Sequence, residues 1–154
     1  MPLHKTLILF ALVGTLSACA QPGSFVPGKS TMTQVRAFVG VPTDIRFATN
    51  GDEQWEYASG PSGTETYLLQ FARGGELKSV TQLLTEEQFG KIIPGRTNKG
   101  DARDLLGRPS NTVFTQNGSS WQWHVRVGNR DGQFVVDFGP DGVVRDKKLS
   151  LQGG

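Results

Sequence analysis

One segment of the chain has the residue types and spacing of a phosphate-binding loop. Residues 23–30 read Gly-Ser-Phe-Val-Pro-Gly-Lys-Ser, which satisfies G-x-x-x-x-G-K-[ST]. In nucleotide-binding proteins, a buried strand delivers this loop and a long helix follows it, so that backbone amides surround the phosphates. Residues 90–97 repeat the pattern with Arg96 in place of the lysine. Such a recurrence indicates a turn followed by a helix cap, and we therefore predict no nucleotide and no cofactor.

Residues that could catalyse a reaction are few and scattered. His124 is the one histidine after residue 4, and Ser119 and Ser120 lie on the same predicted strand, too close in sequence to face it. The Cys, His, Asp and Glu residues do not have the spacing of metal ligands. We therefore interpret His124 as a surface residue and predict a protein that is not an enzyme, with no catalytic residues and no metal site.

The single cysteine, Cys19, stands at the end of a targeting segment. An apolar run at Leu7–Leu16 is too short to span a bilayer, and small residues up to Ala18 follow it. The four residues that end in Cys19 (LSAC) resemble the lipobox of bacterial lipoproteins, in which the cysteine is acylated and becomes the first residue. We predict a signal peptide at 1–18, cleavage between Ala18 and Cys19, and a lipid on Cys19. An ordinary secretory signal with an incidental cysteine is the alternative.

A lipid on Cys19 would also set the location of the protein. Each buried methylene contributes about 0.8 kcal/mol, so several acyl chains hold a protein at a membrane essentially permanently. In the lipoproteins that this segment resembles, an Asp after the cysteine retains the protein at the inner membrane, whereas here Ala20 follows. We therefore predict the cell outer membrane, on its periplasmic side.

Composition limits the class of partner. The chain has 154 residues with 16 Lys and Arg against 14 Asp and Glu, which leaves no basic excess of the kind that nucleic-acid binders carry. Hydrophobic residues make up 36%, and there are 20 Gly and 8 Pro, as in a small, turn-rich globular domain. We predict no nucleic-acid partner.

The segments that would position these residues occur twice. Residues 27–42 (PGKSTMTQVRAFVGVP) and 94–109 (PGRTNKGDARDLLGRP) share Pro, Gly, Arg, Gly and Pro in register, at an offset of 67 residues (Gly28 to Gly95). The offset continues in the pairs Phe71/Phe138 and Gly75/Gly142 and, one residue shorter, in Trp55/Trp121. A period that holds over proline, glycine and aromatic positions indicates two copies of one supersecondary unit.

Each copy predicts short helices followed by strands. The first helix begins at Ser30 or Thr31, where Thr31-x-x-Gln34 fits a capping box, and ends at Gly40. Helices are also predicted at 85–93 and 101–106. Alternating runs predict the strands Gln54–Ala58, Thr64–Phe71, Glu76–Leu84, Ser120–Val127, Gln133–Phe138 and Val143–Leu151. The predicted fold class is α+β, two tandem repeats, each with short helices followed by a three-stranded antiparallel meander.

The domain organisation follows from these elements. After the signal peptide we predict a tether at 19–26, a first repeat at 27–84, a second repeat at 85–151 and a frayed tail at 152–154. A unit of about 60 residues buries little core alone. The two repeats are therefore expected to pack on each other, with one continuous sheet as one arrangement that would achieve this.

Large aromatic residues are the candidate partner contacts. Trp55, Tyr57, Trp121 and Trp123 fall on predicted strands. They either fill the layer between helices and sheet or, where one of a pair is exposed, anchor a partner protein. A basic cluster at Lys147 and Lys148, with Arg145 beside it, is interpreted as a charged edge that discourages strand addition, with contact to acidic lipid headgroups as the alternative.

The order of these motifs resembles a known family. A lipobox is followed by Gly-x-[Ser/Thr], a short helix ended by Gly-x-Pro, Trp-x-aromatic, and an apolar strand that ends in Phe before a glycine turn. This is similar to the SmpA/OmlA (BamE-like) outer-membrane lipoproteins. The match runs from Gly28 to Val80 and, more fully, from Glu86 to about Lys148. The matching positions of the second copy are Gly95, Thr97, Gly107, Pro109, Trp121, Phe138 and Gly142.

The resemblance implies a supporting role in outer-membrane protein assembly or envelope integrity. We therefore predict a lipid-anchored, non-enzymatic protein-binding scaffold whose partners are the membrane and outer-membrane assembly proteins or another periplasmic protein. Two tandem units also resemble β-lactamase inhibitory protein, so a periplasmic inhibitor or ligand-binding module is the alternative.

Overall fold

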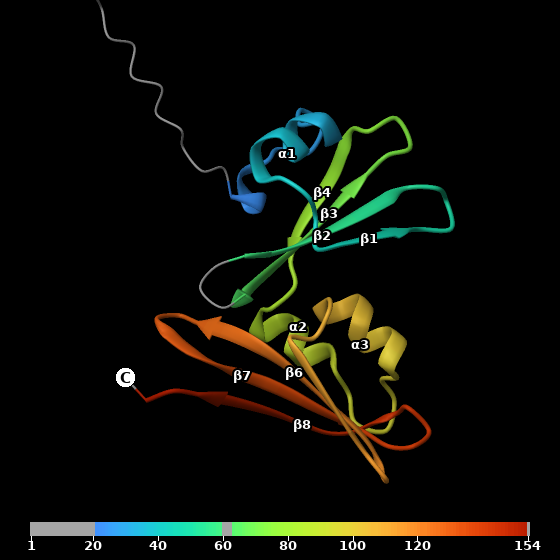
Figure 1. Cartoon of the computed structure of the whole chain (residues 1–154), viewed down its shortest axis with the longest axis vertical. Helices are drawn as coiled ribbons and strands as arrows, with labels where there is room; N and C mark the ends of the chain where they lie inside the picture. The colour runs from blue at the N-terminus through green and yellow to red at the C-terminus, as the bar shows by residue number, and fades with distance from the viewer. Residues whose placement is uncertain (1–20, 60–62, 154) are drawn as a thin grey trace, which may run out of the picture.

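The computed structural model describes residues 21–59 and 63–153. Figure 1 shows the elements in chain order from blue to red. The helices are η1 (Pro22–Ser24), α1 (Met32–Val39), α2 (Glu86–Lys91) and α3 (Lys99–Leu106). The strands are β1 (Asp44–Phe47), β2 (Glu53–Ser59), β3 (Glu65–Phe71), β4 (Leu77–Gln82), β5 (Asn111–Thr115), β6 (Gly118–Val127), β7 (Arg130–Phe138) and β8 (Val144–Leu151).

The described residues form two separate four-stranded sheets. Their orders are β1-β2-β3-β4 and β5-β6-β7-β8, and each strand pairs antiparallel with the next strand along the chain. The prediction of an α+β fold with three-stranded meanders is therefore wrong. The fold is mostly β, with a few short helices and four strands in each meander, and the described strands do not join into one continuous sheet.

The missed strand in each sheet is a short edge strand. β1 pairs with β2 from Asp44 opposite Glu56, and β5 pairs with β6 from Asn111 opposite Gln122. β1 has four residues and alternates between half-buried polar and exposed apolar side chains, the reverse of a core-facing strand, and β5 has no fully buried side chain. Their extended conformation comes from pairing with the neighbouring strand, which a local sequence pattern does not report.

The helix ends follow local signals. In the capping box of α1, the Thr31 hydroxyl accepts from Gln34 N–H at 3.3 Å and the Gln34 side chain accepts from Thr31 N–H at 3.0 Å. α3 has the same arrangement through Asn98 and Asp101. Both helices end at glycines, Gly40 and Gly107, with φ of +95° and +75°, a conformation that side chains with a Cβ rarely adopt.

The two halves repeat each other in atomic detail. Matched backbone hydrogen bonds run from Met32 to Gly75 and Lys99 to Gly142, and from Leu77 to Ser30 and Val144 to Thr97. The register shifts between Gln70 and Phe71 in one sheet and between Asp137 and Phe138 in the other. The Trp55–Phe71 rings lie 4.8 Å apart at 58°, and the Trp121–Phe138 rings 4.9 Å apart at 59°. The same local geometry is thus built twice.

The elements stack in layers, as Figure 1 shows. α1 covers one face of the first sheet, and α2 and α3 lie between the other face of that sheet and the second sheet. The first core contains Val35, Trp55, Tyr57, Leu69, Phe71 and Leu77. The larger second core contains Leu84, Phe89, Ile92, Ala102, Leu106, Trp123, Val125, Phe134, Val136, Phe138 and Val144. The second sheet therefore has described helices on one face only.

η1 occupies part of the segment that was predicted as a tether. Pro22 is buried and Phe25 packs against the first core. Where the structure describes this segment, it rests on the first repeat, close to β3 and β4.

Candidate functional site

The segment with the phosphate-loop pattern is a turn whose amides are already engaged. Gly28 N–H donates to Leu77 O at 2.8 Å, and the N–H groups of Lys29 and Ser30 donate to Val26 O at 3.1 and 2.9 Å. Amides that are used within a turn do not form the concave nest that binds a phosphate. The segment instead leads the chain into α1.

The described residues hold no group of three or more His, Cys, Asp or Glu side chains that could bind a metal ion. His124 is half-buried on β6. Ser119 is buried and belongs to the opposite face of this strand, because successive side chains alternate. Ser120 shares the face of His124 but lies about 13 Å along the strand. Neither serine is placed as a nucleophile beside His124.

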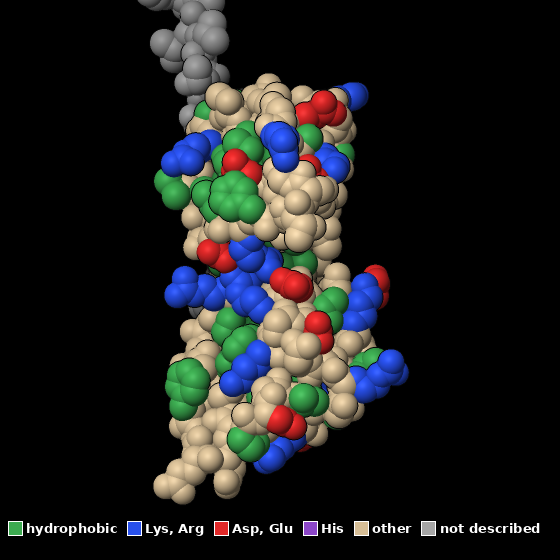
Figure 2. Space-filling view, turned by 90° about the vertical axis from the view of Figure 1, so that its right-hand side faces the viewer, with side chains coloured by type: hydrophobic (Ala, Val, Ile, Leu, Met, Phe, Trp, Pro, Cys, Tyr) green, Lys and Arg blue, Asp and Glu red, His purple; other side chains and the backbone are tan. Residues whose placement is uncertain are grey.

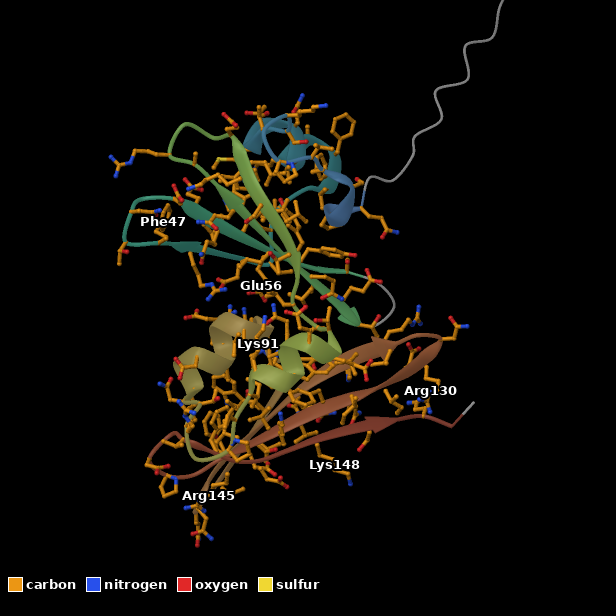
Figure 3. All side chains as sticks on the ribbon, turned by 180° about the vertical axis from the view of Figure 1, so that it is seen from behind. Phe47, Glu56, Lys91, Arg130, Arg145 and Lys148 are labelled. Carbon is orange, nitrogen blue, oxygen red and sulfur yellow. The ribbon has the colours of Figure 1, made fainter. Side chains whose placement is uncertain are left out.

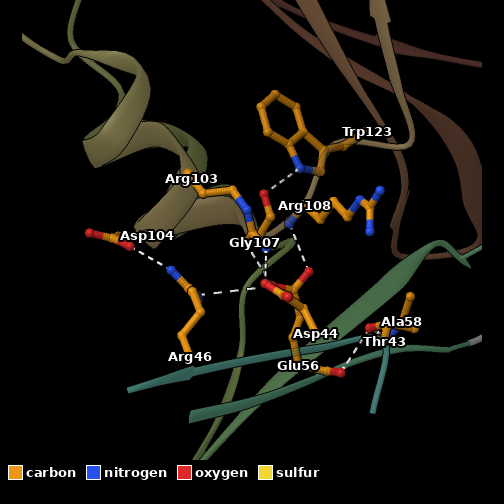
Figure 4. Close-up of polar contacts among 10 residues, drawn as sticks. All are labelled: Thr43, Asp44, Arg46, Glu56, Ala58, Arg103, Asp104, Gly107, Arg108 and Trp123. Carbon is orange, nitrogen blue, oxygen red and sulfur yellow. Dashed lines mark hydrogen bonds and ion pairs between the residues drawn. The ribbon is translucent and has the colours of Figure 1, made fainter. Parts of the chain in front are cut away.

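A buried carboxylate joins the two repeats. Glu56 of β2 is only 2% exposed. Its Oε1 accepts from Arg108 N–H and its Oε2 from Arg103 Nη1, both at 2.7 Å, as Figure 4 shows. Removing a carboxylate from water costs several kcal/mol unless such partners replace the water. Glu56 therefore binds the first sheet, on the face away from α1, to the second repeat. Figure 2 shows charged side chains gathered around the middle of the molecule, where the two repeats meet.

Further ion pairs surround this contact. Arg103 also binds Asp44, and Arg46 binds Asp104 of α3. Gly107, which ends α3, accepts a hydrogen bond from Trp123 Nε1 at 3.2 Å. The loop after α3 is thus held from both sides, by the first sheet and by the second core.

A crevice of about 400 Å³ opens beside the junction. Its lining residues are Thr43, Glu56, Ala58, Gly63, Thr66, Leu84, Arg108, Pro109, Ser110, Trp123 and His124. Both carboxylate oxygens of Glu56 are engaged within the fold. We therefore assign the crevice to the packing of the two repeats.

The predicted aromatic contacts lie mainly in the two cores. Trp55, Tyr57 and Trp123 are 2%, 4% and 1% exposed, and Trp121 is partly buried. Burial raises the pKa of Tyr57 to about 12, against an opposing effect of Arg36. Tyr57 therefore stays neutral and donates to Gly40 O at 3.1 Å. These residues fill the layer between helices and sheet, which is one of the two roles that the sequence leaves open.

An exposed apolar pair marks the edge strand β5, which sequence reasoning missed. Val113 is 50% and Phe114 78% exposed. β5 is the first strand of its sheet, so one side of its backbone pairs with β6 and the other has no strand beside it among the described residues. Residues 109–118 contain no charged side chain. The exposed edge strand could have been predicted from this uncharged run, which contains the strand-favouring residues Thr112, Val113 and Phe114.

The other described sheet edges carry charges. Charged residues on these edge strands are Asp44 and Arg46 on β1, Lys78 on β4, and Arg145, Asp146, Lys147 and Lys148 on β8. Charged side chains on an edge discourage the addition of a foreign strand. Among the described edges, β5 is therefore the one best suited to pair with another chain.

The predicted cleavage and lipid positions, Ala18 and Cys19, lie outside the described residues. In the part of the chain that the structure describes, no helix has the length and apolar character needed to cross a membrane.

Comparisons with known proteins identify no family. No protein-family model matches the sequence, and no curated protein matches it. A DUF4309 family protein (YjgB) from Bacillus subtilis is similar over 86% of both chains, with 15% identity and a TM-score of 0.32. A candidate beta-lactamase inhibitor protein from Streptococcus mutans is similar over 84% of this chain and 87% of its own, with 13% identity and a TM-score of 0.35.

These similarities bear on only one part of the predicted resemblance. The Streptococcus mutans protein agrees in its description with the likeness to β-lactamase inhibitory protein, whereas nothing in the comparisons supports the SmpA/OmlA likeness. At TM-scores of 0.32 and 0.35, neither structure carries an argument about activity or partner.

Proposed function

We propose that this chain is a non-enzymatic protein-binding module that pairs an extended segment of a partner protein with β5. The observation that carries the proposal is the exposed, uncharged edge of this strand. An unpaired strand edge offers a row of backbone donors and acceptors, and a partner strand satisfies them by continuing the sheet. Val113 and Phe114 point to opposite faces of that sheet and would select apolar side chains on the partner.

Photo-crosslinking in intact cells tests this surface. A photoreactive residue at position 114 should give an adduct that maps to one extended segment of a partner. The substitution Val113→Lys should reduce the adduct about tenfold or more, because a charge would be desolvated in the paired edge. A photoreactive residue at Ser150 on the opposite edge strand, β8, is the matched control. Equal adducts at positions 114 and 150, or no effect of Val113→Lys, would contradict the proposal.

We further propose that the module is held at the periplasmic side of the outer membrane by a lipid on Cys19. The lipobox-like residues that end in Cys19 support this. The substitution Cys19→Ser should abolish acyl labelling and move the protein from the membrane fraction to the soluble fraction, because the acyl chains supply the membrane affinity. A Cys19→Ser protein that remains in the membrane pellet, unprocessed, would overturn the anchor.

A role in outer-membrane assembly and a role as a periplasmic inhibitor predict different binding surfaces. If the chain is an assembly scaffold, the β5 adduct should contain a barrel-assembly component, and deletion of the protein should weaken antibiotic exclusion.

The inhibitor alternative is favoured by the outer face of the second sheet, which no described helix covers. It predicts stoichiometric inhibition of a periplasmic hydrolase, weakened by Val135→Glu on that face and unchanged by Val113→Lys. Absence of inhibition across such enzymes removes the alternative.

A further inference from the structure

The described chain begins at the same end of the first sheet at which α1 finishes. Tyr57 and Tyr67 are cross-strand neighbours on the helix-covered face. The Tyr57 hydroxyl donates to Gly40 O at 3.1 Å. A Cβ added to Gly23 of η1 would lie 2.8 Å from the Tyr67 ring. The tyrosine pair thus brings together η1 and the C-terminal end of α1.

Two large apolar side chains are exposed at this end. Phe38 lies two residues before Gly40 and is 67% exposed, and Val41 follows Gly40 directly and is 73% exposed. A single exposed apolar residue needs no explanation. Here, however, two exposed apolar residues lie on either side of Gly40, beside the segment that leads to Cys19, and this pairing calls for an explanation.

The chain between Cys19 and η1 is short. Pro22, the first residue of η1, is buried and is the third residue after Cys19. Three residues span at most about 11 Å. If Cys19 carries lipid, its acyl chains start within that distance of η1. The polar layer on each side of a bilayer is on the order of 5–8 Å thick, so this end of the first repeat must meet the membrane surface.

We propose that Phe38 and Val41 insert into the boundary between lipid headgroups and acyl chains, beside the lipid on Cys19. The bilayer then covers this apolar pair, and the first repeat contacts the membrane through the end that carries η1. The inference rests on the proposed lipid anchor and adds to it a defined orientation of the folded module.

The charges at this end favour apolar insertion over electrostatic attraction. Arg36 lies close enough to Tyr57 to oppose the rise in its pKa that burial causes. Glu65 adds to the effect of burial in raising the pKa of Tyr67. One cation and one anion thus lie beside the tyrosine pair and offset each other. Contact with lipid should therefore depend little on salt or on anionic lipid.

Site-directed labelling of the acylated full chain tests the proposal. Cys19 is the single cysteine, and its sulfur is blocked once it is acylated, so Phe38→Cys or Val41→Cys supplies the only free thiol. Phe47→Cys is the matched control, because Phe47 is also 70% exposed on the first repeat but lies at the opposite end of the first sheet, as Figure 3 shows. Each variant carries a polarity-sensitive dye and is reconstituted into vesicles of equal parts phosphatidylethanolamine and phosphatidylglycerol.

Labels at positions 38 and 41 should be blue-shifted and at least about threefold less accessible to an aqueous quencher than the label at 47, since interfacial side chains sit about 5–10 Å deep. The protection should persist at high salt and in neutral phosphatidylcholine vesicles. Equal quenching at all three positions, in protein that floats with the vesicles, overturns the orientation and leaves the anchor standing. Protein that carries no acyl group and does not float overturns both.

Two other outcomes would also overturn the proposal. Protection that disappears at high salt would mean attraction of charges at the surface and no insertion. Protection of positions 38 and 41 that requires a protein extract, and is absent with vesicles alone, would mean that a protein covers this pair.

Discussion

Glu56 and Gln122 occupy equivalent places in the two repeats, one residue after the repeated tryptophan, and their surroundings differ. Glu56 is buried and binds Arg103 and the backbone of Arg108. Gln122 is half-buried on β6 and pairs in register with Val135, on the sheet face that no described helix covers. The same strand position thus joins the repeats in the first copy and faces outward in the second. The two copies of the unit therefore differ in which sheet face the described residues cover.

The tryptophan environments differ in a related way. Trp55 Nε1 donates to Glu53 Oε2 at 2.9 Å. At the equivalent place the second repeat has Ser119, whose buried hydroxyl has no hydrogen-bond partner among the described residues. The first copy therefore uses carboxylates where the second uses neutral polar groups.

The largest effect is expected at the junction. Glu56→Ala should lower the free energy of unfolding by about 2–5 kcal/mol, because it leaves the Arg108 N–H without its acceptor and leaves Arg103 with Asp44 alone. Gln122→Ala should change it by less than about 0.5 kcal/mol. Urea unfolding of both variants measures the difference. Equal effects of the two substitutions would show that the junction does not stabilise the fold.

The second comparison uses the two glycines that end α1 and α3. A Cβ on Gly107 would lie 2.9 Å from Glu56 Oε1, whereas a Cβ on Gly40 would meet no atom within 4 Å. Both alanine substitutions should cost on the order of 1–3 kcal/mol in backbone strain. Gly107→Ala should cost about 1 kcal/mol more through overpacking at the junction. Matched thermal or urea unfolding tests this, and a larger cost at Gly40 would contradict it.

The smallest effect concerns acid stability. The hydrogen bond from Lys78, at 2.6 Å, holds the pKa of Asp52 below its usual value against the opposing effect of desolvation, and Asn50 and Gln70 help. A carboxyl whose pKa is lower in the folded state stabilises the protein above the unfolded-state pKa. That contribution is lost as pH falls through the folded-state value. Asp52→Asn should therefore make the urea midpoint less sensitive to acid.

A second-repeat carboxyl supplies the control for that measurement. The hydrogen bond from Arg126 lowers the pKa of Asp131, but these side chains are 37% and 43% exposed. Salt screens an exposed pair far more than a buried one. The acid dependence due to Asp131 should fade at high salt. That due to Asp52 should fade less, because Asp52 is 8% exposed even though its partner Lys78 is 46% exposed. A stronger loss of acid dependence at Asp52 than at Asp131 in high salt would show that Asp52 is not the better shielded carboxyl.

Several elements could be predicted from short stretches of sequence because their causes are local. The capping box at Thr31 and the glycine that ends each long helix depend on residues within one turn. The alternation along β6 depends on the pleat of one strand. β1 and β5 were missed because the neighbouring strands supply their hydrogen bonds, and because both are short and leave apolar side chains such as Phe47 and Phe114 exposed.

The candidate surfaces were harder to predict for the same reason. In the sequence, Glu56 is a polar residue between two aromatics on a strand, which is typical of a solvent-facing position. Its burial depends on Arg103 and Arg108, which lie about 50 residues away. In sequence, Phe38 lies in the last turn of a predicted helix and Val41 follows the glycine that ends it, and only the position of η1 sets them beside the start of the described chain.

The residues along the chain were enough to predict that one unit is built twice, that α1 and α3 end at glycines, and which strand faces are apolar, because neighbours in sequence decide those features. The start of α3 was predicted at residue 101, two residues later than Lys99, because the Asn98 capping box was not recognised. Contacts between distant residues decided that the two sheets stay separate with α2 and α3 between them. Among the described residues, they also decided that one sheet face is covered while its counterpart is not, and that β5 has a strand on one side only. These outcomes depend on contacts between distant residues, where the cost of burying a charge such as Glu56 is offset only by partners that the fold brings to it.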